Sequence, residues 1–305
     1  DTARYGPASS ATLPVVTFIT YPSIESDEQR PFSFPYHDAL HGSFAHMLGP
    51  GEKPAFADPD QRYPLVILAH GAFSHGIFDI RHAHRLSSHG YIVAVINYGD
   101  NRTARADQLN LHLGYLRPLQ TRAVLDSLLE SDMFGPHIDA DKIGISGHSF
   151  GGFTALALAG GPFLGDDSTV FDPRIKASVI AAPWVRHRVD GDDLFAFGPN
   201  NTGLGRVRTP VICLFGTNDT DTPASFILPA MRELSGPAYV IELVDQPHVF
   251  EQGSWEDRDN WELLFFSAYL KRDTASLALL KDARSMQGGN EDIQLFDYQQ
   301  LAESD

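Results

Sequence analysis

The chain has 305 residues, of which 43% are hydrophobic and 20% are charged, a composition typical of a soluble globular protein and not of a disordered chain. Its 39 acidic and 23 basic residues give a formal charge of −16, which repels phosphate backbones and argues against nucleic acid as a partner. The only cysteine, Cys213, excludes an intramolecular disulfide and a cysteine-based zinc site.

Strand-like and helix-like segments alternate along most of the chain. Residues 14–21 are β-branched and aromatic and predict a strand, whereas residues 22–62 predict loops with one further strand near residues 32–36. Beyond residue 63, apolar runs predict buried strands at residues 65–69, 91–97, 142–146, 175–181, 210–215 and 239–244. The segments between and after them predict helices at residues 75–88, 117–130, 150–159, 224–234 and 254–270.

This alternation predicts an α/β fold with a mainly parallel central sheet and helices on both faces. No repeat, linker or composition break divides the sequence, so we expect one domain over residues 1–305 with its core in residues 14–270. Residues 183–209 are irregular and predict a loop elaboration, and residues 273–305 predict a polar tail that wraps the surface. The sequence has no run of about 18 apolar residues, so it predicts no transmembrane segment. The acidic charge is compatible with a secreted or periplasmic protein, but compartment and oligomeric state are left open.

The strongest chemical signal is the segment Gly147-His148-Ser149-Phe150-Gly151-Gly152, which matches the pattern G-x-S-x-G. It falls between a predicted strand and a predicted helix, where this pattern forms a nucleophile elbow. Glycines on both sides of the serine allow a sharp turn that lifts the hydroxyl above the sheet. The sequence therefore predicts Ser149 as a nucleophile.

A serine nucleophile needs a histidine base, and that histidine needs an orienting carboxylate. His248 follows the last predicted strand, at the edge where open α/β sheets bind ligands, and is the predicted base; His187 in the irregular segment is the weaker candidate. Asp219 follows the preceding strand and is the predicted acid. Asp221 competes with it, and both aspartates could instead cap the next helix.

The tetrahedral intermediate of such a reaction needs preorganised donors for its oxyanion. The backbone N–H of Phe150, directly after the nucleophile, is one expected donor. The N–H of Ala72, in the loop after the strand at residues 65–69, is the other. Phe73 and Trp184 are expected to line the substrate cleft with Phe150, although aromatic side chains are more often part of a core.

A pair of histidines and a run of aspartates are candidate metal sites, and neither pattern favours one. His82 and His84 are two residues apart on a predicted helix and point to different sides, which favours a structural or surface role over a metal pair. Asp190, Asp192 and Asp193 predict a solvated loop rather than a calcium site. The expected chemistry needs neither a metal nor another cofactor.

Taken together, the alternating strands, His70-Gly71, the Ser149 motif, Asp219 and His248 resemble the α/β-hydrolase superfamily over about residues 14–270. The resemblance implies the α/β-hydrolase fold and a Ser–Asp–His triad.

Three motifs resemble particular branches of that superfamily. Residues 138–144, which lead into the serine motif, are similar to dienelactone-hydrolase-like proteins, but Ser149 stands where true dienelactone hydrolases have cysteine. The motif Gly-His-Ser-Phe-Gly-Gly resembles the platelet-activating-factor acetylhydrolases, with Ala181-Ala182 where the mammalian type has its aspartate. Pro183-Trp184 is similar to the Pro-Trp of cutinase-like polyester hydrolases.

The resulting expectation is a serine carboxylic-ester hydrolase that acts on a small-molecule ester with a short-to-medium acyl or an aromatic group. Alternatives are a polyester hydrolase of the cutinase type and a phospholipid acetylhydrolase. Thioesterases, serine peptidases and acyltransferases use the same triad. A non-catalytic binding protein on the same fold is the alternative from a different class.

Overall fold

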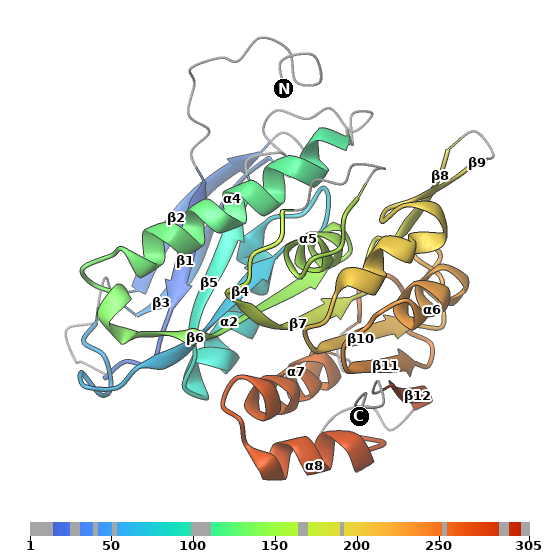
Figure 1. The fold of residues 1–305 in the computed structure, drawn as a ribbon. Coiled ribbons are helices and arrows are strands. Elements are labelled where there is room, and N and C mark those ends of the chain that lie inside the picture. The colour runs from blue at the N-terminus through green and yellow to red at the C-terminus, as the bar shows by residue number, and fades with distance from the viewer. Residues whose placement is uncertain are drawn as a thin grey trace.

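The structure is a computed structural model that describes residues 15–24, 31–38, 42–50, 54–98, 111–163, 170–189, 192–251, 255–286 and 293–299. An eight-stranded mixed sheet with the order β1-β5-β4-β6-β7-β10-β11-β12 forms its centre (Figure 1). These strands are β1 (Val16–Thr20), β4 (Tyr63–Ala69), β5 (Ile92–Asn97), β6 (Ile138–His148), β7 (Ile175–Ala181), β10 (Val211–Gly216), β11 (Ala238–Leu243) and β12 (Ile293–Gln299). The six inner strands run parallel, and the edge strands β1 and β12 run antiparallel to their neighbours.

Helices pack against the sheet through two hydrophobic clusters. They are α2 (Ile80–Ser88), α4 (Leu111–Leu129), α5 (Phe150–Leu158), α6 (Ala224–Arg232), α7 (Trp255–Tyr269) and α8 (Thr274–Asp282), with 3₁₀ turns η1 (Gly76–Asp79), η2 (Gly135–His137) and η3 (Pro199–Arg206). Successive side chains of a strand point to opposite faces, so Ile67 of β4 packs in a cluster with residues of α4, α5 and α6, while Val66 packs in a cluster with residues of α2 and α7. Helices therefore cover both faces, as the alternation predicts.

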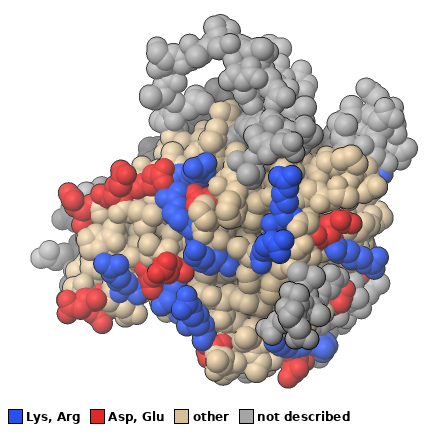
Figure 2. Space-filling model, viewed as in Figure 1, with Lys and Arg blue, Asp and Glu red and all other residues tan. Residues whose placement is uncertain are grey.

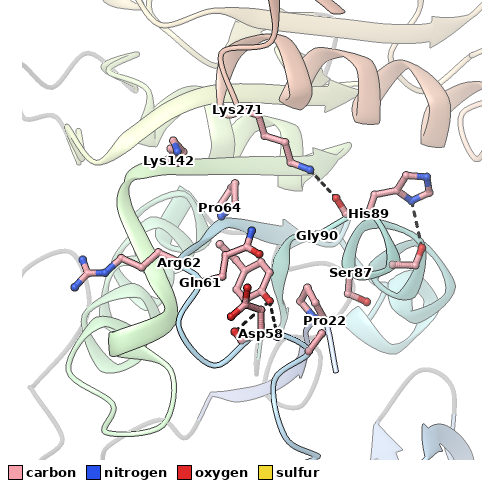
Figure 3. Close-up of a pocket in the computed structure, with 13 residues that line it drawn as sticks. Pro22, Asp58, Gln61, Arg62, Pro64, Ser87, His89, Gly90, Lys142 and Lys271 are labelled. Atoms are coloured by element: carbon pink, nitrogen blue, oxygen red, sulfur yellow. Dashed lines mark hydrogen bonds between the residues drawn. The ribbon is translucent and has the colours of Figure 1, made fainter. Parts of the chain in front are cut away.

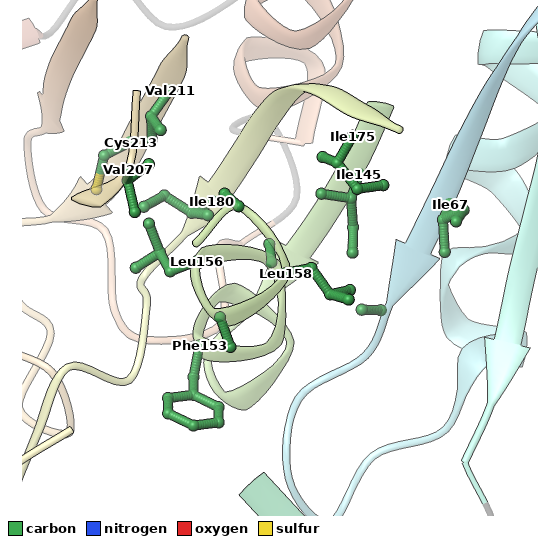
Figure 4. Packing of buried hydrophobic residues seen from close by; sticks show 14 of the residues in the cluster. Ile67, Ile145, Phe153, Leu156, Leu158, Ile175, Ile180, Val207, Val211 and Cys213 are labelled. Carbon is green, nitrogen blue, oxygen red and sulfur yellow. The ribbon is translucent and has the colours of Figure 1, made fainter. Parts of the chain in front are cut away.

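The inner strands are almost entirely apolar because helices bury them on both faces, and α5 is one of these helices. Every residue of β4, β5, β10 and β11 is buried. Figure 4 shows Leu156 and Leu158 of α5 lying beside side chains of β6 and β7 such as Ile145 and Ile180. Full burial of one such side chain contributes about 1.5–3 kcal/mol to the free energy of unfolding. This cluster fixes α5, and with it the turn that joins α5 to β6.

The structure adds strands where the sequence predicts loops. β2 (Pro31–Asp38) covers the expected strand near residues 32–36, but it pairs with a second strand, β3 (Gly42–Pro50), in a region where we expected loops. The irregular segment 183–209 contains the hairpin of β8 (Arg186–Val189) and β9 (Asp192–Phe195). α4 begins at Leu111, six residues before the expected start, and runs through Pro118.

Part of the predicted C-terminal tail forms regular secondary structure. Residues 274–282 form α8, and β12 pairs antiparallel with β11 to complete the sheet. Tyr298 of β12 stacks on Tyr239 of β11 with ring centroids 4.5 Å apart. Apolar and polar residues are mixed in this short strand, and its pairing partner lies at least 50 residues earlier, so its own pattern gives no clear signal of a sheet edge.

Two surface properties bear on possible partners. On the face shown in Figure 2, Lys and Arg side chains lie among Asp and Glu side chains, so the negative charge of the chain does not form one continuous acidic field there. Among the helices of the described residues, none combines the length and the apolar character needed to cross a bilayer.

Candidate active site

Ser149 lies on a strained turn between β6 and α5. Its backbone has φ of 53° and ψ of −115°, a left-handed region that costs a residue with a side chain on the order of 1–3 kcal/mol. A Cβ on Gly147 would lie 2.2 Å from the carbonyl oxygen of Gly151, and a Cβ on Gly151 would lie 1.9 Å from that of Ala69. Only glycine fits at both positions, so the tightness of this turn requires the two glycines that flank Ser149.

Asp219 and His248 form a hydrogen-bonded pair at the same edge of the sheet. The Nδ1 atom of His248 lies 2.9 Å from Oδ2 of Asp219. The Asp219 side chain has no exposed surface and that of His248 is 16% exposed. The loops after β10 and β11 thus place both side chains beyond the carboxyl ends of the parallel strands, where the loop after β6 places Ser149.

Thr222 holds the Asp219 carboxylate in this orientation. Its N–H donates to Oδ1 at 2.8 Å and its hydroxyl lies 2.8 Å from Oδ2. Burial raises the pKa of the Asp219 carboxyl, but the hydrogen bonds from His248 and Thr222 outweigh burial and leave this pKa below the usual value for aspartate. Asp219 is therefore an anion at neutral pH, and its Oδ2 accepts the Nδ1–H of His248.

The competing candidates are placed differently. Asp221 is exposed and contacts Asp219 through its own backbone N–H, which donates to Oδ1 at 2.9 Å. The structure thus brings Asp219, rather than the Asp221 side chain, to His248. His187 lies in β8, and its side chain is outside what the structure describes.

His148 joins the serine turn to the His248 loop, a role that we did not predict. Its Nε2 lies 2.8 Å from the carbonyl oxygen of His248, and the two imidazole ring centroids are 4.8 Å apart. Burial and the neighbouring His248 lower the pKa of His148 to about 3, so its imidazole is neutral and donates Nε2–H to that carbonyl. The only sequence signal was its place as the first variable residue of G-x-S-x-G.

The loop after β4 lies directly against Ser149. A Cβ on Gly71 would lie 3.4 Å from the Cβ of Ser149. The loop turns at residues 71–74, with Ser74 N–H 3.4 Å from the carbonyl oxygen of Gly71 and with Phe73 at a φ of 59°. Ala72 occupies the second position of this turn, and Phe150 is the first residue of α5, whose first N–H groups have no partner within the helix. Both residues predicted to supply oxyanion donors thus belong to segments that flank the nucleophile.

The two predicted cleft residues differ in exposure. Phe73 is 36% exposed on the turn after β4. Trp184 is half-buried, with its ring centroid 5.6 Å from that of Phe150, and its backbone N–H donates to the carbonyl oxygen of Ser149 at 2.9 Å. Trp184 therefore packs beside the serine turn, and Phe73 contributes exposed apolar surface next to the loop that contacts Ser149.

A hollow of about 510 Å³ lies at the opposite edge of the sheet (Figure 3). Its lining includes Tyr63 and Pro64 at the start of β4, Gly90 before β5, and Lys142 of β6 beside the register shift against the start of β4. These residues mark the amino ends of the parallel strands. The hollow is therefore separate from the edge that carries Ser149, Asp219 and His248.

His82 of α2 lies in a buried ionic cluster with α7. Its Nδ1 is 2.5 Å from Oδ1 of Asp259, and its Nε2 is 2.8 Å from Oε2 of Glu262. Burial alone would lower the pKa of His82, but the charge of Glu262 and the two hydrogen bonds raise it to about 9. The same Glu262 oxygen accepts the Ser146 hydroxyl at 3.0 Å, so this cluster supports β6 three residues before Ser149. His84 is exposed, which agrees with the prediction that the two histidines point to different sides.

Several charged groups surround this cluster. Arg81 lies 3.1 Å and Arg85 3.9 Å from Asp259, Arg258 lies 3.9 Å from Glu262, and Asp79 lies 3.6 Å from Arg258. Among the described residues, no group of three or more His, Cys, Asp or Glu side chains is arranged to hold a metal ion.

We expect the stability of the protein to fall as pH rises from about 6.5 to 9. The folded pKa of His82, about 9, lies above the ordinary value of about 6.5, so its stabilisation is complete below pH 6.5 and is lost as pH passes the folded pKa. The expected change is about 3 kcal/mol in the free energy of unfolding. Denaturant unfolding of wild type and His82→Gln across this pH range measures it.

The difference between the two proteins isolates His82 from the other titrating groups. The variant should be less stable than wild type at pH 6 and should approach it at pH 9.5. The exposed His84→Gln is the matched control and should follow wild type above pH 6.5. Parallel stability curves for wild type and His82→Gln would contradict the interpretation.

Comparison of the sequence with family models and with curated proteins identified no relative. A scan against protein-family models and a search among curated proteins each gave no match. The function must therefore be argued from the residues and their geometry.

Proposed function

We propose that the protein is a serine carboxylic-ester hydrolase that works through an acyl-enzyme intermediate. The observation that carries the proposal is the hydrogen-bonded pair of Asp219 and His248 at the sheet edge where the strained turn presents Ser149. An anionic, buried carboxylate that orients a histidine, at the same sheet edge as a serine on a strained turn, is the arrangement that activates a serine nucleophile.

We further propose the α/β-hydrolase fold for this chain. The nucleophile follows β6, the acid follows β10 and the histidine follows β11, which is the chain order of the triad in that fold. The strand–turn–helix setting of G-x-S-x-G and the Gly71 turn beside Ser149 agree with the same fold. This assignment rests on the resemblance of these motifs together with the mostly parallel sheet.

In the proposed reaction, His248 removes the proton of the Ser149 hydroxyl while the serine oxygen attacks the ester carbonyl carbon. The carbonyl π electrons move to its oxygen, which the N–H groups of Phe150 and Ala72 stabilise. When the C–O bond to the alcohol breaks, the imidazolium of His248 gives its proton to the leaving alkoxide. Asp219 holds the tautomer of His248 and stabilises its charged form.

Water then attacks the acyl-enzyme by the same route. His248 takes a proton from the water, the second tetrahedral intermediate collapses, and Ser149 leaves as an alkoxide that recovers the proton from His248. The products are a carboxylic acid and an alcohol. Each proton taken up by His248 is returned within the cycle, so the chemistry requires no further reactant than water.

Phe73 and Trp184 favour an apolar acyl or aromatic group beside Ser149, because their side chains add apolar surface next to the serine turn. A polyester chain and a phospholipid acetyl ester are narrower versions of the same proposal. A non-catalytic binding protein is disfavoured, because binding alone does not require a strained serine together with a buried Asp–His pair.

The test is hydrolysis of p-nitrophenyl esters from acetate to dodecanoate by wild-type protein. We expect turnover that is greatest for the short-to-medium chains. Reaction with a fluorophosphonate should place one phosphonyl group on Ser149, identified by peptide mass spectrometry. Absence of both turnover and labelling would refute the proposed activity and favour the binding protein.

A further inference from the structure

Arg117 is a buried cation behind the loop that follows β4. It lies on α4, and only 1% of the residue is exposed. Its Nη1 donates to the carbonyl oxygen of His70 at 2.6 Å, and its Nη2 donates to that of Gly71 at 3.2 Å. The two carbonyls that precede the Ala72 N–H are thus held by one guanidinium from a different element.

The His70 side chain supplies a further donor to the carbonyl of Gly71. Its Nδ1 lies 2.7 Å from the carbonyl oxygen of Gly71, and its Nε2 accepts the N–H of Tyr98 at 3.1 Å. Burial, with the charge of Arg117, keeps the pKa of His70 well below its usual value, so the imidazole is neutral. An imidazole that accepts at Nε2 carries its proton at Nδ1, so His70 donates to Gly71.

Two of these contacts, from Arg117 Nη2 and from His70 Nδ1, act on the peptide group between Gly71 and Ala72. The carbonyl of Gly71 and the N–H of Ala72 belong to the same peptide bond, whose two dipoles are coupled by resonance. Donors at the oxygen draw electron density toward it, which makes the N–H at the other end a stronger donor. A charged donor has the greatest effect in a buried setting.

Arg117 also contacts the other side of the site. Its guanidinium carbon lies 5.0 Å from the ring centroid of Phe150, the first residue of α5, and 4.6 Å from that of Tyr98, which follows β5. Such cation–π contacts restrict the side chain to one orientation. Arg117 thereby links the Ala72 turn to the first residue of α5.

We propose that Arg117 is a positioning residue for the oxyanion hole: it orients and polarises the Gly71–Ala72 peptide so that the Ala72 N–H points at the developing oxyanion as a strengthened donor. This inference rests on the proposed ester hydrolysis. It adds a role for a residue that no sequence pattern places near Ser149, because Arg117 lies on a helix 30 residues before the start of the serine motif.

The experiment compares Arg117→Met and Arg117→Lys with wild type. Arg117→Met keeps an unbranched, largely apolar stem but removes all donors, and we expect kcat to fall about tenfold to a hundredfold with KM within about twofold. Arg117→Lys keeps the charge without the fork and should lie between them. Arg122→Met is the matched control on the same helix, because Arg122 is exposed and lies 3.7 Å from Asp172; it should keep the wild-type kcat.

Two further readouts separate polarisation from a structural role. A boronic acid that forms a tetrahedral adduct with Ser149 should lose affinity for Arg117→Met by about the same factor as kcat. The infrared carbonyl stretch of a slowly hydrolysed acyl-enzyme should move to higher wavenumber in this variant, because its oxyanion donors are weaker. Arg122→Met should change neither, even where its melting temperature falls.

The outcomes are distinguishable. Unchanged kcat, boronate affinity and carbonyl stretch in Arg117→Met would overturn this inference and leave the proposed hydrolysis standing. Should Arg117→Met fail to fold, Arg117→Lys with all three values of wild type would overturn it equally. Failure of the wild type to show serine-dependent turnover would refute the proposed function and this inference together.

Discussion

Replacing Ser149 by alanine is expected to abolish ester hydrolysis and to leave the fold intact. The hydroxyl oxygen is the proposed nucleophile, so its removal should lower kcat by about 10⁴-fold or more. The turn itself depends on Gly147 and Gly151, which the substitution keeps. We therefore expect a free energy of unfolding within about 1 kcal/mol of wild type. Steady-state kinetics on a short-chain p-nitrophenyl ester and thermal unfolding measure the two effects.

Ser127→Ala is the matched control for this experiment. Ser127 lies exposed on α4, where its hydroxyl donates to the carbonyl oxygen of Ala123 at 2.9 Å. It should retain wild-type turnover. A Ser149→Ala protein that folds and keeps a substantial part of kcat would remove Ser149 as the nucleophile, and the search would return to other nucleophilic side chains at this edge of the sheet.

Replacing Asp219 by asparagine should lower kcat by about 10⁴-fold. The Oδ2 atom that accepts Nδ1–H of His248 would be an amide, which can no longer compensate the imidazolium charge and can favour the wrong tautomer. Asp221→Asn is the control, since its exposed side chain lies two residues away and offers the same change in charge. We expect it to keep most of the wild-type kcat.

This pair of variants also tests the choice between the two aspartates. A large loss in Asp221→Asn with normal activity in Asp219→Asn would reverse the assignment. Because the pKa of Asp219 is lowered in the folded protein, its carboxylate stabilises the fold above the ordinary aspartate pKa and loses this effect as pH falls through the folded value. Asp219→Asn should therefore show a weaker loss of stability on acidification than wild type.

The sequence predicted the inner part of the fold because each inner strand is identifiable by itself. β4, β5, β10 and β11 are buried on both faces and almost entirely apolar, with Asn97 at the end of β5 and Glu242 in β11 as polar exceptions, a local signal that needs no partner. β3 and β12 carry no such signal. Their strand character depends on pairing with β2 and β11, and such long-range contacts are not written in the hydrophobic period of one segment.

The candidate site likewise has residues that local sequence predicts and residues that only tertiary contacts reveal. Glycines around Ser149, and the positions of Asp219 and His248 after successive strands, are local features whose spacing is fixed by the requirements of a sharp turn and a parallel sheet. The sequence by itself therefore determined the α/β class and named these three residues. It left Asp219 and Asp221 as alternatives, because two residues on one loop differ only in which of them faces the imidazole.

Only the tertiary structure decided the groups that act through contacts between distant segments. It brought Asp219, and not the Asp221 side chain, into hydrogen-bond contact with His248, 29 positions away. It also placed His148 on the His248 carbonyl, His82 between two carboxylates of α7, and Arg117 on the carbonyls of the Gly71 turn. A charged or polar side chain becomes stable in a buried position only when folding brings its partners to it, and those partners lie on other elements of the chain.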